Sequence, residues 1–322
     1  MIKSIVILLF FLNFLYCEPK LNMELLKTID SVEELSPFDR LSIAFSDYDN
    51  FYFISNNKNS KIYIFDFNIN LIQSFGGFGE GPSEFINLES IAILNDTLYC
   101  LHRYGRSLKK ISISSKDLCS KDYPIQMSQS IFSTKDFLIQ YWFDANYNKF
   151  DGHISYYSSG KDIYVRKGYL DELNKRRTAF NYQIIPEVDF QNNRVFYTDD
   201  RENLYRITCY DLSNEKIDYI IDKKYRKIPI KNHEFKKYFD AINSLYYTKN
   251  NILLINQMKK EDEINFIFDA YKNGNFIGVI ETKLKYINKW NSSSKLLFIN
   301  DKIFYYNSEE QELNVYNYEI IE

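Results

Sequence analysis

Apolar and polar residues alternate with a period of two along much of this chain. The clearest stretch begins at Leu41, where four short runs, 42–45, 50–54, 61–67 and 71–75, are separated by polar turns. Such alternation is typical of β-strands and does not fit the 3.6-residue period of a helix. The stretch therefore predicts four consecutive strands, joined by short turns.

The same pattern recurs along the rest of the sequence. The third strand of the first unit is echoed by the runs 204–211 and 313–318. The groups recur at spacings of 47, 39, 58, 54 and 54 residues. These are close to the roughly 40 to 50 residues typical of four-stranded propeller blades, with insertions in the middle. The predicted units start near Leu41, Leu88, Met127, Ile185, Phe239 and Ser293.

The last unit contains only three of its four strands before the chain ends. An unassigned apolar run, Asn22–Ile29, lies near the N-terminus and has a suitable length for the missing strand. Pairing the two segments would close a ring and remove free sheet edges. The sequence therefore predicts one all-β domain over 22–322, a six-bladed β-propeller of four-stranded antiparallel blades closed by the N-terminal strand.

A glycine-rich segment, 75–85, follows the fourth predicted strand and holds four of the ten glycines of the chain. Glycine adopts positive φ at low cost and proline fixes its own φ, so this composition predicts a tight loop between two blades. The segment lacks the Lys-Ser/Thr ending of a phosphate-binding loop and runs into another strand, which favours the turn. The residues expected to shape the loop are Gly76, Gly77, Gly79, Gly81, Pro82, Glu84 and Phe85.

This segment resembles the blade-to-blade loop of the bacterial six-bladed β-propeller family related to NHL-repeat propellers. That loop reads much like Gly-x-Gly-x-Gly-Pro-Gly-Glu-Phe, and Ser83 stands in place of its last glycine. The resemblance implies the same fold. It also implies an exported or lipid-anchored ligand-binding module of the bacterial cell envelope.

The first seventeen residues differ from the rest of the chain. Lys3 precedes an apolar run, 5–12, that is too short to cross a bilayer comfortably and is typical of an export signal. We therefore expect residues 1–17 to be a signal peptide, with a short buried or anchoring helix as the alternative. Cys17 stands where a bacterial lipoprotein is acylated, although a small residue normally precedes that cysteine and here Tyr16 does. Cleavage after Cys17 is the alternative, so the protein is expected in the periplasm or as a surface lipoprotein.

The composition and net charge limit the classes of binding partner that we expect. Hydrophobic residues make up 45% of the chain, enough for a sizeable core, and the net charge is −3. This balance gives no general attraction to nucleic acid or to anionic membranes, so we expect no nucleic-acid partner and membrane contact only through an anchor at Cys17. The basic stretch 222–237 is either a solvated loop or a contact for anionic headgroups or an acidic polysaccharide.

The remaining cysteines, Cys100, Cys119 and Cys209, are odd in number and have no metal-ligand spacing. Cys100 lies in an apolar run and is expected to be a buried free thiol, with a bridge to Cys119 as the alternative.

Candidate metal chemistry is sparse. His102, His153 and His233 have no His or Cys neighbour at ligand spacing, and no nucleophile motif occurs. Lactonase-like propellers bind a central divalent ion through carboxylate and Asn ligands, and several aspartates could reach a central channel, although each also suits a turn. We therefore expect no catalytic residue, no metal ligand and no cofactor. The aspartates in question are Asp47, Asp144, Asp189, Asp199 and Asp240.

One segment is typical of a recognition loop. It combines Trp142, Phe143, Asp144, Asn146 and Tyr147, whose aromatic faces and polar groups suit a sugar or a peptide. A buried Trp followed by an ordinary turn is the alternative. The leading hypothesis is a noncatalytic binding or scaffold protein for a protein, peptide or carbohydrate, and the second is a metal-dependent hydrolase or lyase of the lactonase-like type.

Overall fold

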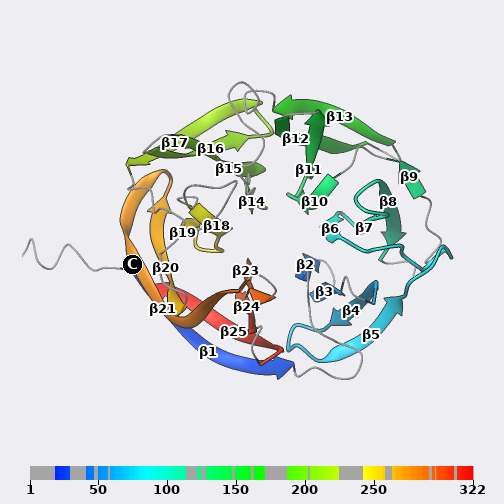
Figure 1. Ribbon diagram of the computed structural model, residues 1–322, viewed down its shortest axis with the longest axis horizontal. Coiled ribbons are helices and arrows are strands. Elements are labelled where there is room, and N and C mark those ends of the chain that lie inside the picture. The colour runs from blue at the N-terminus through cyan, green and yellow to red at the C-terminus, as the bar shows by residue number, and fades with distance from the viewer. Residues whose placement is uncertain are drawn as a thin grey trace, which may run out of the picture.

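The described part of the chain consists of strands, turns and short connections, and it contains no helix. A computed structural model arranges these strands as six small antiparallel sheets around one axis (Figure 1). None of the described residues forms a helix long and apolar enough to cross a membrane. The described residues are 19–29, 41–46, 50–56, 59–113, 122–124, 128–146, 149–160, 163–170, 187–201, 204–224, 242–257, 263–289, 292–293, 295–307 and 310–321.

The first three blades follow one another along the chain, each with its strands in sequence order. Blade 1 contains β2 (Leu41–Ser46), β3 (Phe51–Asn56), β4 (Lys61–Phe65) and β5 (Leu71–Gly76). Blade 2 contains β6 (Ser90–Leu94), β7 (Thr97–His102), β8 (Ser107–Ser112) and β9 (Asp122–Pro124). Blade 3 contains β10 (Ser128–Ser133), β11 (Phe137–Asn146), β12 (Lys149–Gly160) and β13 (Ile163–Leu170).

The last three blades complete the ring. Blade 4 contains β14 (Glu187–Asp189), β15 (Arg194–Arg201), β16 (Leu204–Asp211) and β17 (Lys216–Lys224). Blade 5 contains β18 (Ile242–Tyr247), β19 (Ile252–Gln257), β20 (Glu263–Lys272), β21 (Asn275–Lys289) and β22 (Ser292–Ser293). Blade 6 contains β23 (Lys295–Ile299), β24 (Lys302–Asn307), β25 (Glu312–Ile321) and the N-terminal strand β1 (Lys20–Ile29).

The predicted six-bladed propeller is confirmed. Each predicted unit begins within three residues of the innermost strand of its blade, and the largest difference is Phe239 against Ile242. Blade 5 departs from the four-stranded pattern because β21 is 15 residues long and its end pairs with the two-residue strand β22.

The predicted ring closure is also confirmed. Strand β1 pairs antiparallel with β25, from Lys20 opposite Ile321 to Ile29 opposite Leu313. The two ends of the chain therefore share one blade, which satisfies the backbone groups along the outer edge of β25.

The hydrophobic core lies between neighbouring blades. On β3, Tyr52 and Ile54 pack against Phe304 of blade 6, whereas the intervening Phe53 packs on the other side against Leu98 of blade 2. Successive side chains of a strand point to opposite faces of its sheet, so each blade is buried on both faces. This explains why the second and third strands contain long apolar runs.

The glycine-rich loop joins blade 1 to blade 2 by a tight path. Gly76 has a φ of 99°, and a Cβ atom there would lie 2.8 Å from the Ser60 carbonyl oxygen. The Gly81 N–H donates to Glu84 Oε2 over 2.8 Å. The buried Phe85 packs edge-on against His102 of blade 2, with ring centroids 6.0 Å apart. The loop thus forms part of the joint between the two blades.

Two of the cysteines are buried and free, namely Cys100 and Cys209, whereas Cys119 lies outside the described residues. Burial raises the pKa of the Cys100 thiol and raises that of Cys209 to about 12. Both are therefore neutral thiols near pH 7, as the apolar run around Cys100 predicts.

Candidate functional site in the central channel

The six innermost strands, β2, β6, β10, β14, β18 and β23, surround the axis of the ring (Figure 1). Residues of all six line a cavity of about 580 Å³. Small-molecule sites in proteins typically occupy about 300 to 1,000 Å³, so this channel has the size of a ligand site.

Serine hydroxyls link the inner strands of the first three blades. Ser42 Oγ accepts a 3.1 Å hydrogen bond from the Ile91 N–H on β6, and its hydroxyl lies 3.4 Å from the Ile91 carbonyl oxygen. Ser90 makes the same pair of contacts to Ile131 on β10, at 3.3 and 3.2 Å. Each hydroxyl therefore satisfies one backbone N–H and one backbone C=O of the next inner strand. These groups lie on the edge of that strand that has no neighbouring strand.

Glu187 lies at the corresponding place in the sequence of blade 4. Ser90, Ser130 and Glu187 each lie seven residues before the first residue of the second strand, at Thr97, Phe137 and Arg194. Where the earlier blades carry a serine, blade 4 thus carries a carboxyl group in the channel lining.

The Glu187 carboxyl is partly exposed to the cavity and accepts a 3.0 Å hydrogen bond from the Val188 N–H. Removal from bulk water raises its pKa to about 8, and the Val188 N–H opposes this shift. The carboxyl is therefore mostly protonated at pH 7 and can donate or accept a hydrogen bond.

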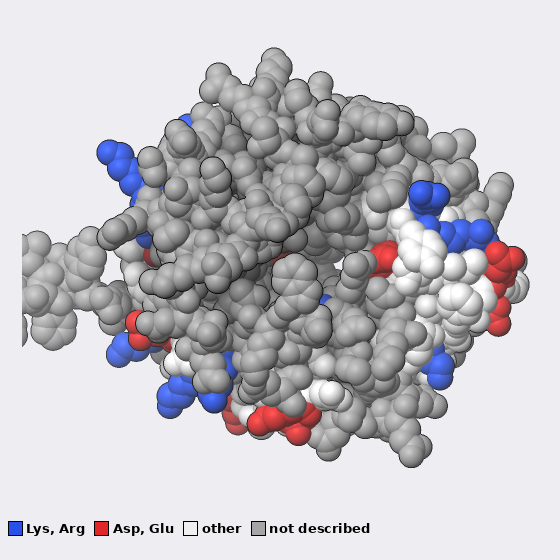
Figure 2. All heavy atoms as spheres, in the orientation of Figure 1, with Lys and Arg blue, Asp and Glu red and all other residues white. Residues whose placement is uncertain are grey.

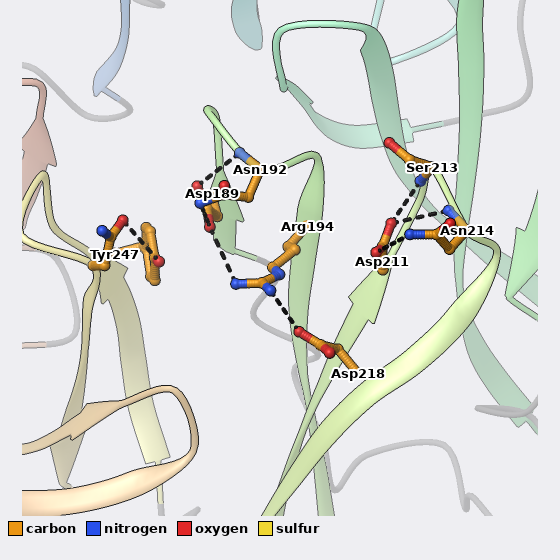
Figure 3. Close-up of polar contacts among 9 residues, drawn as sticks. Asp189, Asn192, Arg194, Asp211, Ser213, Asn214, Asp218 and Tyr247 are labelled. Atoms are coloured by element: carbon orange, nitrogen blue, oxygen red, sulfur yellow. Dashed lines mark hydrogen bonds and ion pairs between the residues drawn. The ribbon is translucent and has the colours of Figure 1, made fainter.

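Asp189, two residues further on the same strand, has a structural role (Figure 3). Its oxygens accept hydrogen bonds from the Asn192 N–H and side-chain amide at 3.1 and 2.8 Å, and Arg194 Nη1 lies 3.9 Å away. Arg194 also pairs with Asp218 of β17 over 2.7 Å. This chain of contacts joins the channel wall to the outermost strand of blade 4.

Tyr247 extends the Asp189 network to blade 5. Its hydroxyl donates to Asn251 Oδ1 over 3.3 Å. Burial, followed by the charge of Asp189 and a hydrogen bond to it, raises the pKa of Tyr247. The phenol therefore stays protonated at physiological pH.

The predicted recognition segment is only partly described. Trp142 is buried within blade 3, where its Nε1 donates to Ser155 Oγ of β12 over 3.0 Å. Phe143, Asp144 and Asn146 lie on β11, but their side chains fall outside the described residues, as does the whole of Tyr147. The binding role of this segment stays a prediction.

Of the five aspartates considered as channel ligands, Asp189 is the one whose side chain the structure describes in the channel. Among the described residues, no three His, Cys, Asp or Glu side chains form a group that could hold a metal ion. The channel carboxylates that could contribute to such a site are Glu187 and Glu89, because Asp189 is engaged by Asn192 and Arg194.

Of the predicted basic stretch, the structure describes Lys223 and Lys224. Lys223 forms an ion pair with Asp269 of blade 5 and lies 5.4 Å from the centroid of the Phe276 ring.

Figure 2 shows basic and acidic side chains beside one another at the right of the drawn face, over blades 1 and 2. The described charges there are mixed in sign.

Sequence reasoning missed the inner-strand serines and Glu187. The signal available in the sequence was the dipeptide Ser-Ile at residues 42–43, 90–91 and 130–131, followed by Glu-Val at 187–188. The dipeptide recurs on the inner strands of the first three blades, and blade 4 differs from them.

Comparison with solved structures supports the fold. A member of the DUF4221 family from Bacteroides vulgatus is similar over 94% of this chain and 99% of its own, with 11% identity and a TM-score of 0.62. A candidate exported protein from Bacteroides fragilis matches over 94% and 96%, with 12% identity and a TM-score of 0.59. A gluconolactonase from Xanthomonas campestris matches over 93% and 90%, with 7% identity and a TM-score of 0.51.

No family model matches the sequence, and comparison with curated proteins gives no match. At these identities the structural similarity concerns the fold alone. The chain is therefore a six-bladed β-propeller, similar in architecture to a candidate exported protein of Bacteroides fragilis and to a gluconolactonase of Xanthomonas campestris.

Proposed function

We propose that this protein is an exported, noncatalytic ligand-binding propeller of the bacterial cell envelope, and that its ligand occupies the central channel. The observation that carries the proposal is the cavity of about 580 Å³ at which all six inner strands meet. A site of this size suits a small molecule or the end of a longer ligand.

The channel wall offers two kinds of contact. Apolar residues such as Ile43, Ile131 and Phe298 line it together with Ser130 and Gln191. Apolar walls with a few polar groups are typical of small-molecule sites, because burial supplies affinity and the polar groups fix orientation.

Export is supported by the apolar segment 5–12 and by the structural similarity to a candidate exported protein of Bacteroides fragilis. The segment and Cys17 lie outside the described residues, so acylation of Cys17 and cleavage after it stay alternative predictions. Intact-mass measurement of the mature protein distinguishes a diacylated cysteine from a chain that starts at Glu18.

The channel site is tested by filling the cavity. Ser130→Trp places a large side chain at a partly buried position of the channel lining, whereas Ser74→Trp places the same side chain at an exposed position of the outermost strand β5. We expect benzyl alcohol, measured by ligand-observed NMR, to bind the wild type and Ser74→Trp but not Ser130→Trp. Equal binding by all three proteins would place the site elsewhere and contradict the proposal.

The second candidate is a metal-dependent hydrolase or lyase. It is favoured by the Glu187 and Glu89 carboxylates in the channel and by the fold shared with a gluconolactonase. A calcium titration followed by calorimetry decides between the two. Stoichiometric calcium binding that Glu187→Gln abolishes would favour the enzyme. A structure of the calcium complex should then show three or more oxygen ligands at ~2.3 to 2.6 Å from the ion.

A further inference from the structure

Among the described residues of the channel lining, Glu187 has a carboxyl group with no side-chain partner. We propose that the ligand joins a protonated amine to an apolar body and that Glu187 binds the amine. This inference rests on the channel function proposed above.

The position of Glu187 is the first support. On the inner strands of blades 1 and 2, Ser42 and Ser90 use their hydroxyls to bridge to the next inner strand. Glu187 instead accepts one hydrogen bond, from the Val188 N–H to Oε1. Among the described residues, no donor lies within hydrogen-bond distance of its second oxygen. That oxygen is available to a donor that enters the channel.

The other acidic groups in the channel lining have partners. Asn87 donates to Glu89 Oε1 over 2.6 Å, and Asp189 accepts hydrogen bonds from Asn192 and lies beside Arg194. Glu187 is therefore the carboxyl in this lining that has no side-chain partner among the described residues.

The basic group of the lining is engaged on another blade. The Lys249 ammonium lies 5.5 Å from the centroid of the Tyr318 ring. The backbone N–H of Lys249 donates a hydrogen bond to the hydroxyl of the same tyrosine over 3.1 Å. The Glu187 carboxyl thus shares a largely apolar cavity with an acidic network on its own strand and with the phenol of Tyr247. A cation brought by the ligand would stabilise the ionised form of this carboxyl.

The apolar residues of the channel wall indicate the chemical nature of the rest of the ligand. Ile43, Ile131, Val188 and Phe298 present apolar surface around the cavity. A strongly hydrated polyamine or an amino sugar would lose its water there without enough polar partners. An amine attached to an aromatic or branched aliphatic group matches both parts of the site.

Ionisation of Glu187 is coupled to this binding. Burial holds its pKa near 8, so the free protein carries the proton at pH 7. An ammonium ion at hydrogen-bond distance stabilises the carboxylate, and the proton is released when the complex forms.

Three probes of nearly equal size test the inference: benzylamine, benzyl alcohol and benzoate. We expect calorimetry at pH 7 to show that the wild type binds benzylamine at least tenfold more tightly than benzyl alcohol, and benzoate most weakly. Glu187→Gln keeps the side-chain size and is expected to lose the preference. Glu80→Gln, at an exposed glutamate paired with Arg103, is the matched control and should keep it.

Equal affinity for benzylamine and benzyl alcohol, or a preference that persists in Glu187→Gln, would overturn the inference. If benzyl alcohol binds in the channel without any preference for the amine, the channel function stands and the amine inference fails. If none of the three probes binds, both fail.

A second measurement does not need the variant to fold. Calorimetry of wild-type benzylamine binding in buffers of different ionisation enthalpy gives the number of protons released. A carboxyl with a pKa near 8 is about nine-tenths protonated at pH 7, so we expect close to one proton per benzylamine. Binding without proton release would contradict a protonated Glu187 in the free channel.

Discussion

Thr28 Oγ1 donates a 2.6 Å hydrogen bond to Asn314 Oδ1, although 286 residues separate them along the chain. The bond lies in the strand pair β1 and β25, where Thr28 is directly opposite Asn314. It therefore joins the two ends of the chain in one blade and fixes their register.

Loss of this hydrogen bond should weaken the closed ring. Thr28→Val removes the donor and leaves the largely buried Asn314 amide oxygen without it, which should cost about 1 to 2 kcal/mol of unfolding free energy. Urea unfolding at pH 7 measures the change. Thr28→Ser keeps the hydroxyl and is expected to stay within about 0.5 kcal/mol of the wild type.

Removal of residues 18–30 should have a larger effect, because it exposes the whole edge of β25. We expect a lower melting temperature and concentration-dependent association. A monomer of unchanged melting temperature would show that the ring does not depend on β1.

The inner-strand serines should contribute to stability through the neighbouring blade. Ser90→Ala leaves the Ile131 N–H and C=O without the bridging hydroxyl, which should cost roughly 1 to 3 kcal/mol. Ser74→Ala on the outermost strand is exposed and should change the unfolding free energy by less than about 0.5 kcal/mol. Chemical unfolding of both variants measures the difference, and equal effects would argue against the bridging role.

Glu187 should make the protein less stable as the pH rises. Its pKa is raised to about 8 in the folded state, whereas an unfolded glutamate titrates near ~4.3, so the folded state binds the proton more tightly between these values. The free energy of unfolding therefore falls as pH increases through that window, by an amount on the order of a few kcal/mol.

Unfolding in urea at intervals from pH 5 to pH 9 measures this dependence. Glu187→Gln cannot ionise, so its stability relative to the wild type should increase from pH 5 to about pH 8 and level off above it. Parallel pH profiles for the two proteins would mean that the carboxyl is not removed from water in the channel.

Two adjacent glycines of the blade-to-blade loop provide a matched comparison. Gly76 and Gly77 both have positive φ, at 99° and 139°, so alanine is strained at either position. A Cβ at Gly76 would also lie 2.8 Å from the Ser60 carbonyl oxygen and 2.9 Å from the Phe85 ring, whereas a Cβ at Gly77 meets nothing within 4 Å. We expect Gly76→Ala to lose about 1 to 3 kcal/mol more than Gly77→Ala in thermal or urea unfolding. Equal losses would mean that the loop yields at this contact.

The fold could be predicted because its signals are local. Alternating runs such as 61–67 and turn residues between them mark strands, and their recurrence marks the blades. The N-terminal run Asn22–Ile29 was assignable to the last blade because that unit lacked one strand.

The channel could not be predicted in the same way, because its contacts join residues of different blades. Ser42 meets Ile91 through the packing of two sheets, and no local period encodes that contact. Alternation also does not say which side chains lie inside a blade, so Trp142 could not be distinguished from an exposed aromatic residue before its contact with Ser155 was known.

The position of a bound ligand in a crystal shows directly whether the central channel is the binding site. We suggest soaking crystals of the wild type with 4-bromobenzylamine and locating the bromine by its anomalous scattering. We expect one strong peak inside the channel, between the walls formed by Ile43 and Ile131, with the amine within hydrogen-bond distance of Glu187. A peak on the outer surface of the ring, or an empty channel in crystals that bind the compound, would contradict it.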